Sequence, residues 1–177
     1  MKRTFSVLFV LALTVTAVSC SKNKSTTASA HNDADVMFAQ DMIPHHQQAV
    51  EMAGMALEQT KNPQVVDLAR RIKKAQDPEM MQMRGFLKDW GKSAMGNEDH
   101  GMSGMMSAAD MKRLGTARDA AFDKLFLQMM TMHHQGAVKM AQTEQADGKS
   151  TPAKKLAAAI IEAQNKEIAE MKQLSRA

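Results

Sequence analysis

The sequence matches itself when it is shifted by 88 residues, and this repeat constrains the fold more than any other feature. Identical residues at this offset fall in two segments of each half. In the first segment the pairs include Asp35 with Asp123, Phe38 with Phe126, Met42 with Met130, His45 with His133, His46 with His134 and Met52 with Met140. In the second they include Leu68 with Leu156, Ile72 with Ile160, Gln76 with Gln164, Glu79 with Glu167 and Met83 with Met171. Such agreement at one offset predicts an internal duplication.

Each half is predicted to be a helical hairpin, because apolar residues recur at spacings of three and four. In the first half, one helix is expected over residues 33–59 and the next up to about Trp90. Between them, Asn62 is typical of a helix N-cap and Pro63 of a first helical turn. Pro78 lies inside the second helix, where a proline favours a kink.

The second half carries similar signals. Thr151 and Pro152 are expected to repeat the cap and the proline, so that the last helix runs from Pro152 to the end of the chain. The preceding helix is expected to end near Gly148, since glycine favours helix C-termini. Ser107 followed by Asp110 predicts an N-cap at the start of the second hairpin.

These boundaries give one duplicated domain over residues 33–177, with a hairpin at 33–90, a linker at 91–106 and a hairpin at 107–177. The linker is rich in Met, Gly and polar residues, and it is long enough to permit a crossover. No segment has the pattern of a strand. The sequence therefore predicts an all-α fold, a ferritin-like four-helix bundle with a long connection between its hairpins.

Residues 1–20 have the pattern of a signal peptide, because Lys2 and Arg3 precede an uncharged apolar run that leads to Cys20. The run is too short for a membrane-spanning helix. Small residues before the single cysteine predict a periplasmic lipoprotein, in which Cys20 carries the lipid, and Ser21 favours the outer membrane. Residues 21–32 are then a flexible tether. Ordinary cleavage near an incidental Cys20 is the alternative, and it also gives an exported protein.

The charge balance argues against nucleic acid as a partner. The net charge of +4 falls to +2 when Lys2 and Arg3 leave with the signal peptide, and no cluster of Lys and Arg with interleaved aromatics occurs. One cysteine cannot form an internal disulfide. The sequence also offers no nucleophile constellation, phosphate loop or nucleotide motif, so hydrolytic and nucleotide-dependent catalysis have no support.

Methionine is unusually frequent, with seventeen Met after Cys20 against eight Leu. A single Met on an apolar stripe is more simply interpreted as filling a gap in the core. Three features favour metal binding for the set: the linker carries Met where no core is expected, Met42 and Met130 precede paired histidines, and the repeat retains them. Thioether and imidazole form a soft ligand set that favours Cu(I), with Cu(II) as an alternative and Ag(I) as a mimic.

The two histidine pairs are the sharper signal. His45 and His46 share a helix face with Met42 and Met52 at steps of three and four, and the second copy repeats this pattern. A lone histidine there would be a hydrogen-bonded core residue, whereas a duplicated pair with Met favours metal. The candidate ligands are Met42, His45, His46, Met52, Met83, Met130, His133, His134, Met140 and Met171. The candidate linker ligands are His100, Met102, Met105 and Met106.

Polar residues on the second helix of each hairpin are expected to meet these histidines. Counting from the turn puts Gln76 level with His46, and Glu79 lies nearby on the same stripe. Because burying unpaired polar groups is costly, we expect such residues to orient the imidazoles or to bind the metal directly. A buried network that only fixes helix register is the alternative. The secondary candidates are Gln76, Glu79, Gln164, Glu167, Asp35 and Asp123, of which the two aspartates are also suited to capping near a helix start.

Residues 42–53, Met-Ile-Pro-His-His-Gln-Gln-Ala-Val-Glu-Met-Ala, resemble the bacterial domain-of-unknown-function family 305, which includes CopM-like copper-binding proteins. Residues 133–141, His-His-Gln-Gly-Ala-Val-Lys-Met-Ala, match as well, and the likeness spans nearly all of the chain from residue 33. The resemblance implies a ferritin-like four-helix bundle and a periplasmic copper binder linked to copper tolerance. In the second copy Thr131 and Met132 replace the Ile-Pro step, so the two sites are expected to differ in affinity or access.

The leading hypothesis is a non-enzymatic copper-binding protein of the envelope. It would sequester copper, or act as a metallochaperone for a copper exporter or another copper-handling protein. A ferritin-like di-metal oxidase is disfavoured, because no Glu-x-x-His motif occurs. The third hypothesis is a structural or partner-binding lipoprotein whose His, Gln and Glu residues only hold the bundle together, and it predicts no stoichiometric metal.

Overall fold

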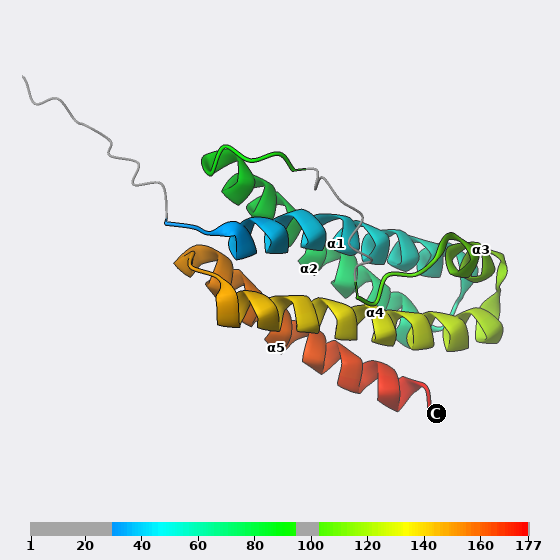
Figure 1. Cartoon of the computed structure of the whole chain (residues 1–177). Coiled ribbons are helices and arrows are strands. Elements are labelled where there is room, and N and C mark those ends of the chain that lie inside the picture. The colour runs from blue at the N-terminus through cyan, green and yellow to red at the C-terminus, as the bar shows by residue number, and fades with distance from the viewer. Residues whose placement is uncertain (1–29, 95–102, 177) are drawn as a thin grey trace, which may run out of the picture.

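The computed structural model describes residues 30–94 and 103–176. These residues form helices and no strand: α1 (Asp33–Gln59), α2 (Pro63–Asp89), α3 (Ala108–Thr116), α4 (Asp119–Asp147) and α5 (Thr151–Leu174). Figure 1 shows the long helices α1, α2, α4 and α5 packed together, with the short α3 at one end. The predicted all-α bundle is confirmed.

Asparagine caps begin both helices of the first hairpin. Asn32 and Asp35 form a capping box at the start of α1, in which each side chain accepts a hydrogen bond from the other residue's backbone N–H. Asn62 caps α2, and Pro63 follows in its first turn, as predicted. α2 continues as a helix through Pro78.

The cap of α5 lies one residue before the predicted one. Ser150, not Thr151, is the N-cap, because its hydroxyl accepts a hydrogen bond from the Ala153 backbone N–H. Gly148 does end α4, as predicted, although its φ of −67° needs no glycine. A side chain there would collide with the carboxylate of Glu144, so glycine is needed for space.

The second hairpin begins later than predicted. Ser107 is an N-cap, but of the separate helix α3. The Arg118 guanidinium donates hydrogen bonds to the carbonyls of Gly115 and Ala117, which closes this helix, and α4 starts afresh at Asp119. The described residues therefore contain the four long helices of the predicted bundle and one short helix, α3, that was not predicted as a separate element. The break between α3 and α4 consists of two extended residues, Ala117 and Arg118. No proline or pair of glycines at this place predicts it from the sequence.

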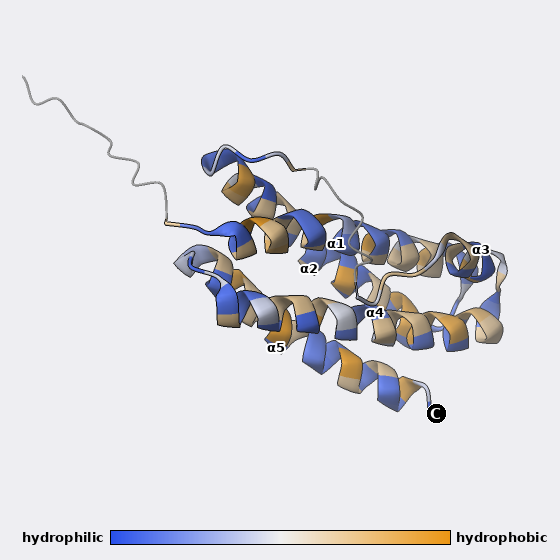
Figure 2. Ribbon diagram, in the orientation of Figure 1, coloured by the Kyte–Doolittle hydropathy of each residue, from blue (hydrophilic) through white to orange (hydrophobic). Residues whose placement is uncertain are grey.

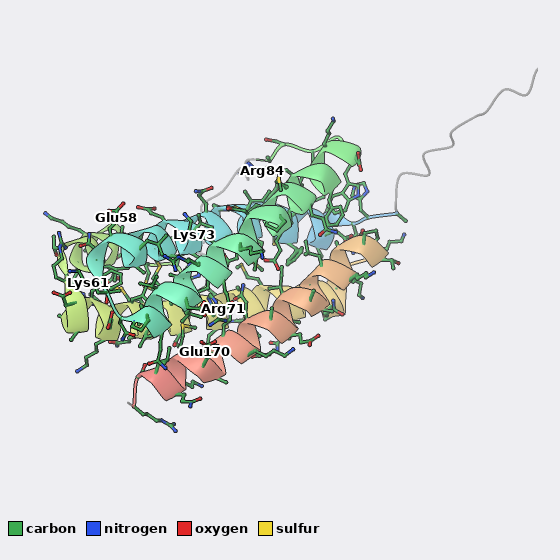
Figure 3. All side chains as sticks on the ribbon, turned by 180° about the vertical axis from the view of Figure 1, so that it is seen from behind. Glu58, Lys61, Arg71, Lys73, Arg84 and Glu170 are labelled. Atoms are coloured by element: carbon green, nitrogen blue, oxygen red, sulfur yellow. The ribbon has the colours of Figure 1, made fainter. Side chains whose placement is uncertain are left out.

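α1 pairs with α2, α4 pairs with α5, and α1 packs against α4 in the middle of the bundle. α1 and α4 run in opposite directions (Figure 1). The outer helices α2 and α5 diverge and touch much less. Figure 3 shows Arg71 of α2 and Glu170 of α5 pointing toward one another, and their ion pair spans 2.5 Å. Both side chains are partly exposed, so this pair adds little to stability.

Two apolar clusters fill the bundle, and hydrophobic positions face the helix interfaces in Figure 2. One cluster takes residues 49–56 of α1 and 122–130 of α4 together with Val138, and the other takes residues 36–43 of α1 with Ala137 and Ala141 of α4. The paired histidines fall between these segments on both helices. A central polar layer therefore separates the two apolar clusters.

Each hairpin holds the turn of the other. The Asp35 carboxylate, in the first turn of α1, accepts hydrogen bonds of 2.8–3.1 Å from the backbone N–H groups of Lys149 and Ser150 in the α4–α5 turn. Its repeat mate Asp123, on α4, accepts one of 2.9 Å from the Asn62 side chain in the α1–α2 turn. Ten helical residues span about 15 Å, so both aspartates act at the ends of the bundle, well away from the histidines.

The predicted signal peptide with Cys20, and the tether up to residue 29, lie outside the described residues. Across residues 30–94 and 103–176, no helix has the length and apolar character needed to cross a membrane. The predictions of a lipid anchor and of export therefore stay predictions.

Candidate metal centre

The four paired histidines lie together in the central layer, and each has an exposed fraction of 1% or less. The imidazoles of His45 on α1 and His133 on α4 face each other, with ring centroids 3.8 Å apart and planes at 36°. His134 lies beside His133, with centroids 6.4 Å apart. The layer thus brings both repeats of the motif into one site.

A carboxylate from the second helix of the same hairpin holds each flanking histidine. His46 Nε2 lies 2.8 Å from Glu79 Oε2, and His134 Nε2 lies 2.8 Å from Glu167 Oε2. These are the contacts expected from the polar positions on the second helices. Because a carboxylate only accepts, Nε2 carries the proton in both rings. In the neutral imidazole, Nδ1 then carries the lone pair that a metal requires.

His45 has the same orientation, since its Nε2 donates to the Ser103 carbonyl at 3.1 Å. Among the described residues, the Nδ1 atoms of His45, His46 and His134 and both nitrogens of His133 have no hydrogen-bond partner. Buried polar atoms are normally satisfied, and a bound ion or water commonly explains those that are not. The layer therefore presents unpaired nitrogen donors at its centre.

The two central rings are neutral at neutral pH. Burial, together with the neighbouring imidazoles, lowers the pKa of His45 to about 3 and holds the pKa of His133 well below 6.5. Because both rings are neutral, their centroids can lie 3.8 Å apart without charge repulsion. They also need lose no proton before binding a metal.

The two glutamines of the layer are buried but not tied to the histidines. Gln76 was expected level with His46, whereas His46 donates its hydrogen bond to Glu79, one helical turn further along α2. Both polar side-chain atoms of Gln76 and the Oε1 atom of Gln164 lack a hydrogen-bond partner in the described part of the chain. They add unpaired oxygen and nitrogen to the same layer.

Buried methionines lie one helical turn from the His46–Glu79 pair. Met42 precedes His46 by four residues on α1, and Met83 follows Glu79 by four on α2. Since α1 and α2 are antiparallel, both thioethers lie on the same side of the pair, and both belong to one apolar cluster. Met140 packs against this cluster and is half-buried. The arrangement offers sulfur next to nitrogen.

The second half repeats this arrangement with Met130 and Met171 beside the His134–Glu167 pair. These two methionines share the other apolar cluster with Met52 of α1. Both halves thus combine a His–Glu pair with two fully buried thioethers from the same hairpin. The matching contacts indicate an approximate twofold relation between the hairpins, while the duplication itself stays a prediction.

Residues 103–106, which we call the strap, fix the end of the linker beside this layer. The Gln48 side chain donates to the Met106 carbonyl at 2.9 Å and accepts from the Met106 backbone N–H at 2.7 Å. A Cβ at Gly136 of α4 would collide with the Ser103 carbonyl, which is the same carbonyl that accepts from His45. The missing side chain at Gly136 therefore lets the strap cross α4.

The strap was not predicted, although one feature of the repeat indicates where it packs. Gln48 and Gly136 are repeat mates, and they differ inside an otherwise conserved repeat motif. In the structure both residues serve the strap, one by binding its backbone and the other by making room for it. A mismatch within a repeat can therefore mark the place where an asymmetric segment packs.

The end of the linker packs on the core. The expectation that linker methionines have no core to fill was wrong for Met106, which is 9% exposed and belongs to an apolar cluster. Met105 is half-buried. The bond between Gln48 and the Met106 backbone draws this end of the linker onto the bundle. His100 and Met102 lie outside the described residues.

The layer is not a ready-made site of the usual nitrogen and oxygen type. Within residues 30–94 and 103–176, no group of three or more His, Cys, Asp or Glu side chains is close enough to hold a metal ion. A metal in this layer would take thioether ligands as well, or shift a side chain. The neutral imidazoles and buried thioethers fit a soft cation.

Comparisons with known proteins agree with this fold. Solved structures with similar folds include a DUF305 protein from Streptomyces coelicolor, with 37% identity, TM-score 0.77, and coverage of 80% of this chain and 89% of that one. A DUF305 fragment from Deinococcus radiodurans has 32% identity and TM-score 0.74, covering 81% of this chain and 96% of that one. No match is found among curated proteins.

A third similar structure is CopM in its Cu(I)-bound form, with 35% identity and TM-score 0.70, covering 80% of this chain and 95% of that one. CopM is also solved in Cu(II)-bound and Ag-bound forms. The family model described as a domain of unknown function, DUF305, matches residues 35–175. The chain therefore belongs to the DUF305 family.

Proposed function

We propose that this protein binds copper, chiefly as Cu(I), in the central layer of the bundle, and that it sequesters the metal or passes it on in the cell envelope. It is a binding protein rather than an enzyme in this proposal. Cys20 anchors it by lipid, which would hold it at the periplasmic face of the outer membrane. A copper exporter or another copper-handling protein is the expected exchange partner.

The observation that carries the proposal is the pairing of buried imidazoles with buried thioethers. The unpaired Nδ1 atoms of His46 and His134 each lie in a ring oriented by a carboxylate, within one helical turn of two methionines. Sulfur and imidazole suit Cu(I), and a carboxylate bonded to the far nitrogen raises the basicity of the ligand. The carboxylate also balances the charge of a buried cation.

The solved forms of CopM support the same metal. CopM shares the fold at 35% identity and has been solved with Cu(I), Cu(II) and silver. Silver is a soft monovalent ion, as Cu(I) is, so thioether ligands suit both. Cu(II) prefers nitrogen and oxygen donors, which the histidines and glutamates of the layer would supply.

A structural role is the second candidate, and the two 2.8 Å His–Glu contacts favour it. Buried hydrogen bonds of this kind can fix helix register without any metal. In that case the protein would bind copper weakly, and copper would leave its unfolding temperature unchanged. The unpaired nitrogens of the layer are the feature that this alternative leaves unexplained.

The test is a Cu(I) titration of the reduced chain from Ser21 onward against a competing chelator. We compare wild type with Met42→Leu/Met83→Leu and Met130→Leu/Met171→Leu, since leucine keeps the volume and removes the sulfur. Met81→Leu is the matched control, because Met81 is 67% exposed on α2. Each double variant should lose one tight site while the control keeps both. Undiminished binding in both double variants would refute the thioether sites.

A variant of the four histidines separates copper binding from the thioether assignment. Replacing His45, His46, His133 and His134 with Gln should abolish tight binding if the layer is the site. Circular dichroism and unfolding curves confirm that each variant keeps its helical fold. If neither the wild type nor any variant competes with the chelator, the structural alternative holds.

A further inference from the structure

The short helix α3 covers one end of the α1–α4 pair (Figure 1). Leu114 of α3 is fully buried in an apolar cluster, and Met111 packs against the same cluster. Gln59 donates a hydrogen bond of 3.4 Å to the Gly115 carbonyl, and Gly115 lies against Met55. The residues of α1 and α4 that form this seat are Met55, Gln59, Phe122 and Leu125.

The repeat mates of these four residues line an open pocket at the opposite end of the α1–α4 pair. At the offset of 88 they are Thr143, Asp147, Ala34 and Met37, and all four line the same pocket of about 370 Å³. In the described part of the chain no helix lies over this pocket, and Met37 is 52% exposed. The pocket is thus the counterpart of the seat of α3, without its helix.

The chemistry of the pocket differs from that of the occupied seat in its charge. Its apolar lining comes from Met37, Phe38 and Met140, and the carboxylates of Asp33, Asp41 and Asp147 also line it. The occupied seat has none of these carboxylates, since the mates of the three aspartates are Ala121, Met129 and Gln59. An apolar surface bordered by acidic groups favours a helix that is both apolar and basic.

We propose that this pocket binds a short amphipathic helix of a partner protein, with Met or Leu side chains on one face and Lys or Arg beside them. The helix α3, which covers the equivalent seat at the other end of the bundle, is itself apolar and basic. Its Met111 and Leu114 face the core, and Lys112 and Arg113 lie between them in sequence. A single helix over a pocket of this size buries little area, so the complex is weak and exchanges quickly. The proposal does not depend on copper.

The test uses a blocked synthetic peptide of residues 106–118 as the probe and the full mature chain as the target. Methionine methyl NMR follows Met37 and Met140, which are assigned through Leu substitutions. We expect their signals to shift, with a dissociation constant of about 10–1000 μM. A peptide with Lys112→Glu and Arg113→Glu should bind at least about tenfold more weakly, and added salt should weaken the binding of the original peptide.

Two variants test the location. Met37→Glu should abolish the shift of Met140, and Asp33→Asn should weaken binding a few-fold. Met81→Glu is the matched control, because Met81 is also exposed but lies on α2, outside the pocket. Near-native circular dichroism in Met37→Glu shows that lost binding does not reflect unfolding, and Asp33→Asn provides a milder second variant.

Three outcomes would overturn the proposal. The first is the absence of any shift with about 2 mM peptide, which lies above the range expected for a specific weak complex. The second is a shift at Met55 and Met111 in place of Met37 and Met140, which would show that the peptide replaces the resident α3. The third is self-association of the chain alone that Met37→Glu abolishes, which would make a second copy the occupant.

Discussion

His45 and His133 stand 88 residues apart in the chain, and their rings meet at 3.8 Å across the α1–α4 interface. Repeat mates that touch each other must lie near the centre of the twofold relation between the hairpins. His45 donates a hydrogen bond of 3.1 Å to the Ser103 carbonyl, whereas neither ring nitrogen of His133 makes a hydrogen bond of this quality within the described residues. The two halves are therefore inequivalent at their point of contact, and His133 is the less constrained ring.

Acid should destabilise the metal-free protein through these two rings. Their pKa values in the folded protein lie below 6.5, so below that pH the unfolded chain binds more protons and stability falls toward pH 3. For His45 the full effect is on the order of 5 kcal/mol. His133→Leu should reduce the loss, which urea unfolding at pH 4, 5.5 and 7 would measure. An unchanged slope in the variant would contradict the assignment.

Glu144 should act in the opposite direction. Burial, and then the neighbouring Asp35 carboxylate, raise the pKa of Glu144 from 4.5 to about 8. Between these values the folded protein binds more protons than the unfolded chain, so this residue lowers stability as pH rises from 4.5 to 8. Glu144→Gln keeps a donor for Asp35 and should stabilise the protein at pH 8 by about 1–3 kcal/mol, with little effect at pH 4.5. Thermal unfolding at both pH values checks this, and equal shifts at the two would refute it.

The carboxylates beside the flanking histidines should tune the metal rather than the fold. Glu79→Gln retains an acceptor for His46 but removes the charge, so Cu(I) affinity should fall about 10–100-fold with little change in helicity. Glu167→Gln should act alike on the other half. The control is Glu162→Gln, whose side chain is 72% exposed in its pair with Lys166. Chelator competition measures the Cu(I) affinity of all three variants. If Glu162→Gln lowers the affinity as much as the other two, Glu79 and Glu167 do not have the assigned role.

Gly136 and Gly85 form a matched pair of helical glycines with opposite expected effects. Ala at 136 would collide with the Ser103 carbonyl, whereas a Cβ at 85 meets nothing within 4 Å. Gly136→Ala should cost about 1–3 kcal/mol and speed hydrogen exchange in the strap, because the strap must move. Gly85→Ala should stabilise by about 0.5–1 kcal/mol. Similar effects of the two substitutions would argue against a tight crossing at Gly136.

Cys20→Ala should move the protein from the membrane fraction to the soluble periplasm, because the lipid could no longer be attached. Cell fractionation with radiolabelled palmitate measures both location and acylation. Copper affinity of the released protein should be unchanged. If the protein with Cys20 intact is found in the soluble fraction, the lipid anchor is refuted and export with an ordinary signal peptide is the remaining explanation.

The predictions that held were those resting on local helical geometry. The positions of α1 and α2, and the meeting of Glu79 with His46, follow from a constant rise per residue and from the place of a turn. Helical counting could not say whether Gln76 or Glu79 would bond His46, because it fixes the height of a residue along the bundle but not the inclination of one helix to another.

The features that could not be predicted from the sequence are tertiary contacts between segments that lie far apart in the chain. The strap can pack against α4 because Gly136 lacks a side chain. The sequence of residues 103–106 itself does not predict this contact. Asp35 was a candidate near a helix start, but the turn that it holds is 114 residues away in the chain. Likewise the break before α4 depends on how Arg118 meets the end of α3.

Asp35 and Asp123 each bind the turn of the other hairpin, and this reciprocal contact affects how the protein unfolds. A hairpin separated from its mate would lose the carboxylate that holds its turn and would expose the face of α1 or α4 that carries the histidines. Neither hairpin is then a stable unit by itself, although each has its own pair of antiparallel helices. The two halves should melt in one cooperative transition, with no intermediate in which a single hairpin survives.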